Sequence, residues 1–141
     1  MKTWWKRFNK FIHLPWSDQR LLAEAFAVVA IVKLGLKLLP FGQFRNLYSV
    51  LTQAQQNEET TSHIIEQRVW AIRKVSGSLA AVCLPQALAL TCFLRKDKAV
   101  VLIVGVRKNG PFEAHAWVEK NGTTLIGELP DAHFQPLWIW Q

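Results

Sequence analysis

The stretch 81-AVCLPQALAL-90 places a cysteine two residues ahead of a proline, at the start of an apolar run with helical spacing. Proline is tolerated in the first turn of a helix, where its ring costs no hydrogen bond, and is strongly unfavourable further in. A helix over residues 84–94 therefore starts near Val82 to Leu84, which puts Cys83 at its N-terminus. The unpaired N–H groups and the dipole of that end favour a thiolate over a thiol. The alternative is an inert, buried cysteine, because free cysteines are among the most buried residues.

The segment that follows this helix changes to a pattern typical of strands. Residues 99–106, AVVLIVGV, form an apolar, largely β-branched run that suits a buried strand. Two Asn-Gly pairs come next, at 109–110 and 121–122, each between candidate strands. Asn-Gly strongly indicates a hairpin because a two-residue type I′ turn needs positive φ at both positions. The sequence therefore predicts an antiparallel sheet after the cysteine helix.

The second Asn-Gly pair gives a cross-strand register. If residues 121–122 form the turn, counting outward sets His115 directly opposite Glu128, on one face of the sheet. An imidazole can take the proton of Cys83, and a carboxylate on its other nitrogen fixes the tautomer. Trp117 shares the face of His115 in an alternating strand. The alternative is a surface pair between His115 and Glu128 that does no chemistry.

The N-terminal half is predicted to be helical. Residues 21–39, LLAEAFAVVAIVKLGLKLL, form a long apolar segment that we expect to be capped by Ser17 and to end before Pro40. Three charged residues interrupt it, which argues against a transmembrane span. A second helical piece follows Pro40, and a third helix begins near Ser62 and ends at residues 76–77.

The chain has 141 residues, half of them apolar, which suits one domain with its own core. Helices come first and strands after, as in an α+β fold. We predict a single domain over residues 17–141, in which a cysteine-bearing helix packs on a small antiparallel sheet. Residues 17–77 form its helical part, and residues 78–141 hold the cysteine helix and the sheet. Residues 1–16 form a basic, aromatic N-terminal arm.

The charge of the chain is +7, and residues 1–20 carry five bases, one acid and three tryptophans. Such an arm suits an acidic partner, a membrane surface or nucleic acid, although a solvated tail is equally compatible with it. The two cysteines have no spacing typical of a metal site. Nine helical residues separate Cys83 from Cys92 and turn the two sulfurs to opposite faces, so we expect no disulfide between them. Because no disulfide is expected, we predict that the protein works in a reducing, cytoplasmic compartment.

The strings CLPQALAL, VLIVGV and AHAWVE together resemble the stand-alone leader peptidases of lasso-peptide biosynthesis, which belong to the transglutaminase-like, papain-related cysteine proteases. The resemblance implies that Cys83 is the nucleophile and His115 the general base. The third residue of that family is usually an aspartate shortly after the glycine turn. Glu128 stands at the matching place here, and Asp131 is the alternative. No cofactor or metal is implied.

The implied reaction is hydrolysis of one peptide bond in a ribosomally made precursor, which releases the leader. The resemblance implies three partners: the precursor peptide, a small leader-recognition protein and an asparagine-synthetase-like macrolactam cyclase. It implies no nucleic acid, while membrane contact through the N-terminal arm and the long helix stays open. Two other classes of function remain. One is a transglutaminase-like acyltransferase or a non-catalytic scaffold, and the other is a basic protein that binds nucleic acid or a membrane surface.

Overall fold

The computed structural model describes residues 2–53, 57–107, 109–111, 113–127 and 134–140. Within them, five helices precede a four-stranded antiparallel sheet, which confirms the predicted α+β class. The helices are α1 (Lys2–Ile12), α2 (Trp16–Leu38), α3 (Phe41–Thr52), α4 (Ser62–Leu79) and α5 (Cys83–Phe93). The strands are β1 (Val100–Arg107), β2 (Glu113–Lys120), β3 (Thr123–Ile126) and β4 (Phe134–Trp140).

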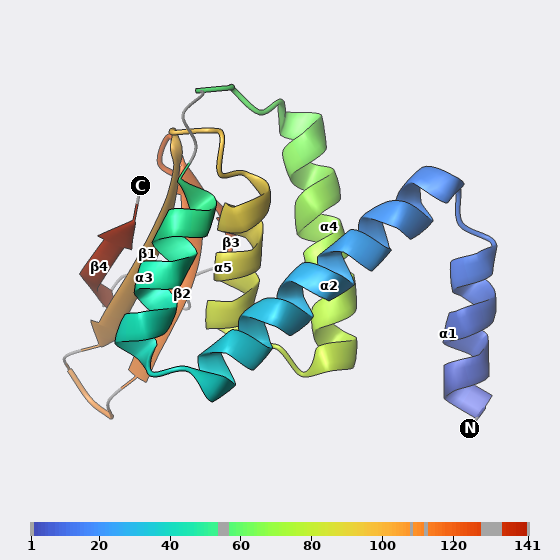
Figure 1. Ribbon diagram of the computed structural model, residues 1–141, viewed down its shortest axis with the longest axis horizontal. Coiled ribbons are helices and arrows are strands. Elements are labelled where there is room, and N and C mark those ends of the chain that lie inside the picture. The colour runs from blue at the N-terminus through green and yellow to red at the C-terminus, as the bar shows by residue number, and fades with distance from the viewer. Residues whose placement is uncertain (1, 54–56, 108, 112, 128–133, 141) are drawn as a thin grey trace.

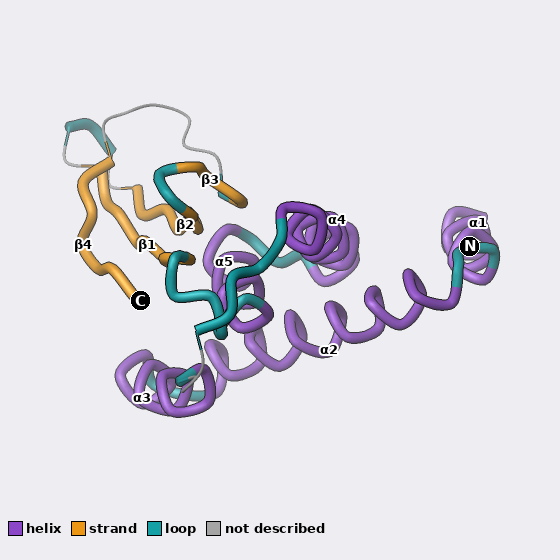
Figure 2. Tube along the Cα trace, turned by 90° about the horizontal axis from the view of Figure 1, so that it is seen from above, coloured by secondary structure: helices purple, strands orange, loops and turns teal. Residues whose placement is uncertain are grey.

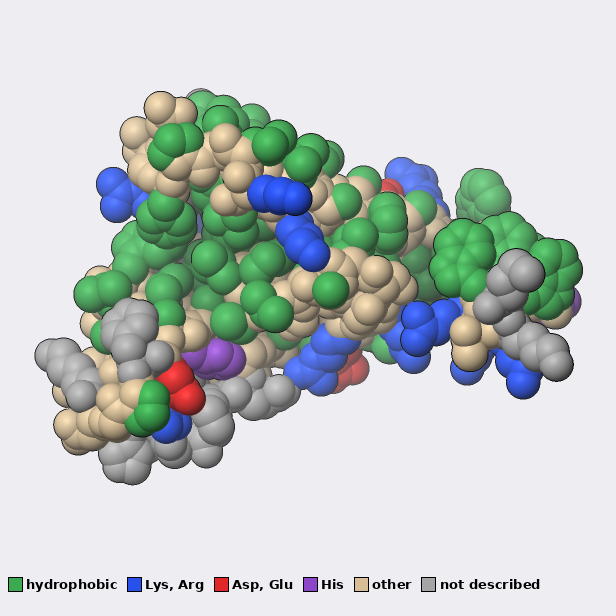
Figure 3. Space-filling model, turned by 90° about the horizontal axis from the view of Figure 1, so that it is seen from below, with side chains coloured by type: hydrophobic (Ala, Val, Ile, Leu, Met, Phe, Trp, Pro, Cys, Tyr) green, Lys and Arg blue, Asp and Glu red, His purple; other side chains and the backbone are tan. Residues whose placement is uncertain are grey.

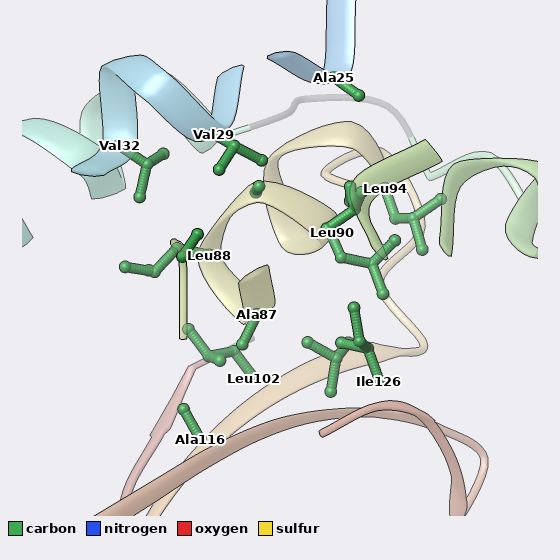
Figure 4. Close-up of a cluster of buried hydrophobic side chains, with 14 of the residues drawn as sticks. Ala25, Val29, Val32, Ala87, Leu88, Leu90, Leu94, Leu102, Ala116 and Ile126 are labelled. Atoms are coloured by element: carbon green, nitrogen blue, oxygen red, sulfur yellow. The ribbon is translucent and has the colours of Figure 1, made fainter. Parts of the chain in front are cut away.

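Helix α5 lies in the middle of the molecule, between the sheet and the other helices (Figures 1 and 2). Its residues Ala87, Leu88, Ala89 and Leu90 are fully buried. Figure 4 shows why: side chains of α2 cover α5 from one side, and Leu102, Ala116 and Ile126 of the sheet cover it from the other. Because apolar burial is the main stabilising term in folding, packing between these two layers stabilises the central helix.

Prolines set where two of the helices begin. Pro15 precedes α2 and Pro40 precedes α3, each with the extended backbone of an N-cap residue. Helix α2 thus starts at Trp16, and the expected cap by Ser17 is wrong, because Ser17 lies inside the first turn. Proline suits this place since its fixed φ directs the chain into a helix whose first N–H groups need no partner.

Helix α4 continues past the residues at which the sequence predicts its end. It runs through Ser76 and Gly77 to Leu79. A glycine inside a helix costs only about 1 kcal/mol, so tertiary contacts can override it. Here the end of α4 is stabilised by the ammonium group of Lys33 in α2, which donates hydrogen bonds to the carbonyl oxygens of Leu79 and Ala80. Ala80 ends the helix in a left-handed conformation, with φ of 47°.

The sheet has the strand order β3-β2-β1-β4. The predicted turn between β2 and β3 is confirmed: Asn121 and Gly122 have φ of 50° and 78°, as a type I′ turn needs. Past the turn, however, the register shifts by one residue between Val118 and Glu119, where a bulge adds Leu125 to β3. The count that set residue 115 opposite residue 128 assumed an unbroken register and does not carry past this bulge.

A buried polar cluster joins the loop before β1 to the end of β2. The Asp97 carboxylate accepts hydrogen bonds from Lys120 Nζ at 2.8 Å, from the Thr60 N–H at 2.9 Å and from the Ala99 N–H at 3.1 Å. Lys120 also donates to the Thr60 carbonyl oxygen at 2.9 Å. Burial alone would raise the pKa of Asp97, but these hydrogen bonds outweigh it, so the pKa lies below its usual value.

The expected N-terminal arm contains helix α1, which stands at the end of α2 that is far from the sheet (Figures 1 and 2). Gln19 of α2 holds the connection, since its side-chain N–H groups bond the carbonyl oxygens of Ile12 at 3.1 Å and Leu14 at 2.8 Å. Across the residues that the structure describes, no helix combines the length and hydrophobicity that crossing a bilayer requires.

Candidate active site

Cys83 is the first residue of α5, as the sequence predicts. Val82 precedes it with an extended backbone, and Pro85 lies in the first turn, where proline is tolerated. The side-chain amide of Gln86 donates a 2.8 Å hydrogen bond to the Ala81 carbonyl oxygen and ties the turn to the preceding loop. The Cys83 thiol is free and half-buried. The cysteine thus meets the positive end of a helix dipole without being enclosed in the core.

Helix α5 and strand β2 run in the same direction. Asp97 follows the end of α5 and contacts Lys120, the last residue of β2, so the two elements end together. At their middle, Ala87 and Ala116 both belong to the core cluster between α5 and the sheet (Figure 4). Cys83 precedes Ala87 by one helical turn, about 6 Å, and that rise matches about two residues of a strand. Cys83 is therefore level with the first residues of β2, where His115 lies.

The His115 imidazole has a defined hydrogen-bond partner. Its Nε2 atom lies 3.0 Å from the carbonyl oxygen of Gly127. A carbonyl oxygen can only accept, so Nε2 carries the proton, and in the neutral ring Nδ1 keeps its lone pair. The ring also packs against Trp117, with centroids 6.2 Å apart, and against Phe134 at 5.6 Å. These contacts fix the orientation of the ring and leave Nδ1 as its basic atom.

Two glycines make room for this arrangement. A Cβ atom at Gly105, the cross-strand partner of His115, would lie 2.8 Å from ring carbons of Trp117. A Cβ atom at Gly127 would lie 2.5 Å from the Ala116 carbonyl oxygen, and Gly127 has φ of +80°. Both positions need glycine for space, and Gly127 needs it for its backbone conformation as well. The Trp117 ring is held in turn by a 2.8 Å hydrogen bond from its Nε1 to Glu119.

The alternation of β2 separates two sets of side chains. Ala116 and Val118 belong to the core cluster that includes α5, whereas His115, Trp117 and Glu119 occupy the other positions of the strand. By this alternation His115 points to the face of the sheet opposite α5, so residues 83 and 115 lie at the same end of the α5–β2 pair but not on facing surfaces. The structure forms no hydrogen bond between the Cys83 thiol and the imidazole, whose partner is Gly127.

The two acids that the sequence suggests for the third position, Glu128 and Asp131, lie outside the described residues. The acceptor that the structure does describe at Nε2 is the backbone oxygen of Gly127, which the sequence did not predict. A backbone acceptor has no side-chain signature. The only hint is the glycine itself, placed directly after the second strand of the hairpin, where a left-handed residue redirects the chain.

The second cysteine differs from Cys83 in its surroundings. Cys92 lies near the other end of α5, and burial raises the pKa of its thiol. A buried thiol with a raised pKa holds little of the nucleophilic thiolate at neutral pH. Among the residues described, no group of three His, Cys, Asp or Glu side chains is placed to hold a metal ion.

Comparison with known proteins gives one match. The sequence model of a protein family described as the transglutaminase-like superfamily matches residues 28–139. The matched segment contains α3, α4, α5 and the strands of the sheet up to residue 139, together with α2 from Val28 onward, and it leaves out α1 and the first half of α2. Neither the comparison with curated proteins nor that with solved structures gave a significant match.

Proposed function

The chain belongs to the transglutaminase-like superfamily, and from that premise we propose that it is a cysteine peptidase which removes the leader from a ribosomally made lasso-peptide precursor. The superfamily supports cysteine-dependent acyl chemistry, either hydrolysis or transfer. The leader-peptide substrate rests on the resemblance carried by the CLPQALAL and AHAWVE strings. The observation that supports the proposal is that Cys83 begins α5 and that His115, whose Nε2 donates to Gly127, lies at the same end of the fold.

In the proposed mechanism, the Cys83 sulfur attacks the carbonyl carbon of the scissile bond, and its proton passes to Nδ1 of His115. The backbone N–H of Cys83, at the start of α5, donates a hydrogen bond to the developing oxyanion. The imidazolium then protonates the departing amine, which is the new N-terminus of the core peptide. A water molecule, deprotonated by His115, cleaves the thioester, releases the leader as a carboxylate and restores the thiol.

The role of Gly127 in this mechanism is to hold the ring. Its carbonyl oxygen accepts the Nε2 proton and so keeps the lone pair on Nδ1 in the neutral histidine. As His115 becomes an imidazolium, the same hydrogen bond strengthens because its donor is charged. The mechanism requires the His115 ring, which lies on the face of the sheet away from α5, to move until Nδ1 is within hydrogen-bond reach of the Cys83 sulfur.

Two partners complete the proposal. A small leader-recognition protein presents the precursor, so cleavage by the purified chain alone is slow or unselective. The released amine of the core peptide is then joined to a side-chain carboxylate by an asparagine-synthetase-like cyclase. Both partners follow from the resemblance in the sequence, as does Glu128, or Asp131, as an additional acid beside His115.

The direct test is cleavage of a precursor peptide by the purified chain together with the recognition protein, followed by mass spectrometry. Cys83→Ala abolishes cleavage, and His115→Ala lowers its rate by about 10²- to 10⁴-fold, the usual contribution of a general acid–base. The matched control Cys92→Ala stays within about twofold of wild type, because it leaves the nucleophile intact. Cleavage that survives in Cys83→Ala contradicts the proposal. Transfer of the leader to an added amine would instead show that the chain is an acyltransferase.

A second test needs no substrate. In a Cys92→Ser background, alkylation of Cys83 by iodoacetamide is followed between about pH 5 and 9, since only the thiolate reacts. If His115 is the base, His115→Gln slows alkylation at neutral pH and changes the shape of the pH profile. His63→Gln, a variant of an exposed histidine at the start of α4, leaves the profile unchanged. Identical profiles for the two variants would separate Cys83 from His115 and refute the pair.

A further inference from the structure

Helix α1 exposes an unusual amount of aromatic surface. Trp4 is 79% exposed and Trp5 is 74% exposed, while Phe8 and Ile12 are each 53% exposed. Large apolar side chains gathered on a surface mark a place of contact with a partner or a membrane. Within the described structure, these four side chains are not part of the core cluster.

The exposed apolar residues of α1 share one face. At 100° per residue, positions 4, 5, 8 and 12 fall within about a third of the helix circumference. Lys6, Arg7 and Lys10 point away from that stripe, and α1 has no acidic residue. Figure 3 shows this separation: hydrophobic side chains gather on one side of α1, and basic side chains lie below them. The helix is therefore amphipathic, with a purely cationic polar face.

The helix is attached to the domain at one end only. Phe11 packs against the core, and Gln19 holds the turn after Ile12 through two hydrogen bonds. Trp16, the first residue of α2, is 81% exposed just beyond this turn. The region matched by the superfamily begins at residue 28, so α1 lies outside the part that carries the acyl chemistry. Helix α1 is thus a separate feature, joined to the domain at its C-terminal end, and its apolar face has no cover in the described structure.

We propose that α1 binds the surface of an anionic phospholipid bilayer and anchors this chain there as a peripheral protein. A helix with tryptophan and phenylalanine on one face and lysine and arginine on the other lies in the plane of the interface, where indole rings are favoured. The basic face attracts anionic headgroups. Nucleic acid fits less well, because its binding would need basic side chains and aromatic rings on the same surface of α1.

The size of the helix suits reversible attachment. Its 11 residues span about 16 Å, which allows the apolar face to enter the boundary between headgroups and acyl chains. A single short amphipathic helix of this kind binds a membrane through two terms, apolar burial and charge attraction. The two terms respond differently to the composition of the bilayer. Loss of the aromatic rings weakens binding to any bilayer, whereas loss of the basic charges weakens binding only to anionic bilayers.

The test is flotation of the full chain with vesicles of phosphatidylcholine alone, or with about one third phosphatidylglycerol. The wild-type chain floats with the anionic vesicles, and added salt weakens this binding because it screens the charges. Trp4→Ser with Trp5→Ser lowers the partition coefficient by at least about tenfold, since two buried rings are lost. Lys6→Glu with Lys10→Glu lowers it on the anionic vesicles only.

The matched control is Arg45→Glu with Lys74→Glu, which changes the net charge equally at exposed positions of α3 and α4. This variant retains most of the binding. Circular dichroism establishes that each variant keeps the wild-type helix content. The proposal is overturned if the chain does not float with anionic vesicles, if the control variant loses as much binding as the α1 variants, or if the basic face proves to bind RNA in place of lipid. None of these outcomes depends on leader cleavage, so the vesicle experiment tests membrane binding independently of the proposed function.

Discussion

Replacing Gly127 by alanine tests the packing around His115. The glycine has φ of +80°, a conformation that costs an L-residue about 1–2 kcal/mol. The new Cβ atom would also lie 2.5 Å from the Ala116 carbonyl oxygen and 3.0 Å from the Trp117 Cα, both of them backbone atoms. Backbone cannot rotate aside as a side chain can, so the strand itself must shift. Forced overpacking of this kind adds about 1–3 kcal/mol.

The chain supplies a matched control at Gly122. This residue has φ of +78°, but a Cβ atom there would meet nothing within 4 Å. Gly122→Ala therefore carries the conformational cost alone, about 1 kcal/mol. Gly127→Ala carries that cost and the collision together, for a total of about 3 kcal/mol. The difference between the two variants isolates the close contact of residue 127 with β2.

The assay is unfolding in urea, followed by circular dichroism, with leader cleavage measured in parallel. Gly127→Ala lowers the free energy of unfolding by about 2 kcal/mol more than Gly122→Ala does. It also lengthens the 3.0 Å hydrogen bond to His115 Nε2, so the remaining folded protein cleaves more slowly. If the two variants are equally stable, the close packing of Gly127 described here is wrong. Full cleavage activity in Gly127→Ala would remove its carbonyl from the mechanism.

Two further predictions concern buried polar groups. Asp97→Asn removes the close counter-charge of the Lys120 ammonium, leaves only the exposed Glu59 carboxylate at 4.0 Å, and lowers the free energy of unfolding by about 3 kcal/mol at pH 7. The contacts of Asp97 lower its pKa, so the stabilisation that its carboxylate provides is present above about pH 4 and is lost as pH falls through the folded pKa. Urea unfolding therefore shows the free energies of unfolding of wild type and variant converging at acid pH. Tyr48→Phe removes the 2.6 Å hydrogen bond from the Tyr48 hydroxyl to the Leu88 carbonyl oxygen and costs about 1 kcal/mol. Burial raises the pKa of Tyr48, so wild type loses more stability than the variant as pH rises above about 10, and a variant that loses as much refutes the assignment.

The features that the sequence predicted well depend on local backbone chemistry. Pro85 is strongly unfavourable in a helix interior, and this alone placed the start of α5 near residues 82–84, with Cys83 at its N-terminus. The Asn121-Gly122 pair suits few conformations other than the observed turn. Each of these inferences needs only the residue and its nearest neighbours, so tertiary structure had little opportunity to override it.

The features that the sequence missed depend on distant contacts. Helix α4 runs past Gly77 because Lys33, more than 40 residues away, caps its end. Strand β4 was not predicted, since Pro136 interrupts its pattern, yet it pairs with β1 at the edge of the sheet, where proline is tolerated. The bulge at Leu125 shifts the register of the hairpin, and no residue type at this place indicates a bulge.

The candidate site likewise has one part that the sequence predicted and one part that it did not. The type and order of Cys83 and His115 were visible in the sequence because thiol and imidazole are chemically distinctive. The hydrogen bond from His115 to Gly127 was not visible, because every residue has a carbonyl oxygen and only the fold selects which one an imidazole meets.

The burial of α5 limits how a peptide substrate, under the proposed function, would reach the Cys83 sulfur. Residues 87–91 of this helix are buried, while Val82, just ahead of it, is 68% exposed. An incoming chain would therefore meet the start of α5 before its buried middle. Under the proposed function, selectivity among peptides would depend on the residues around that start.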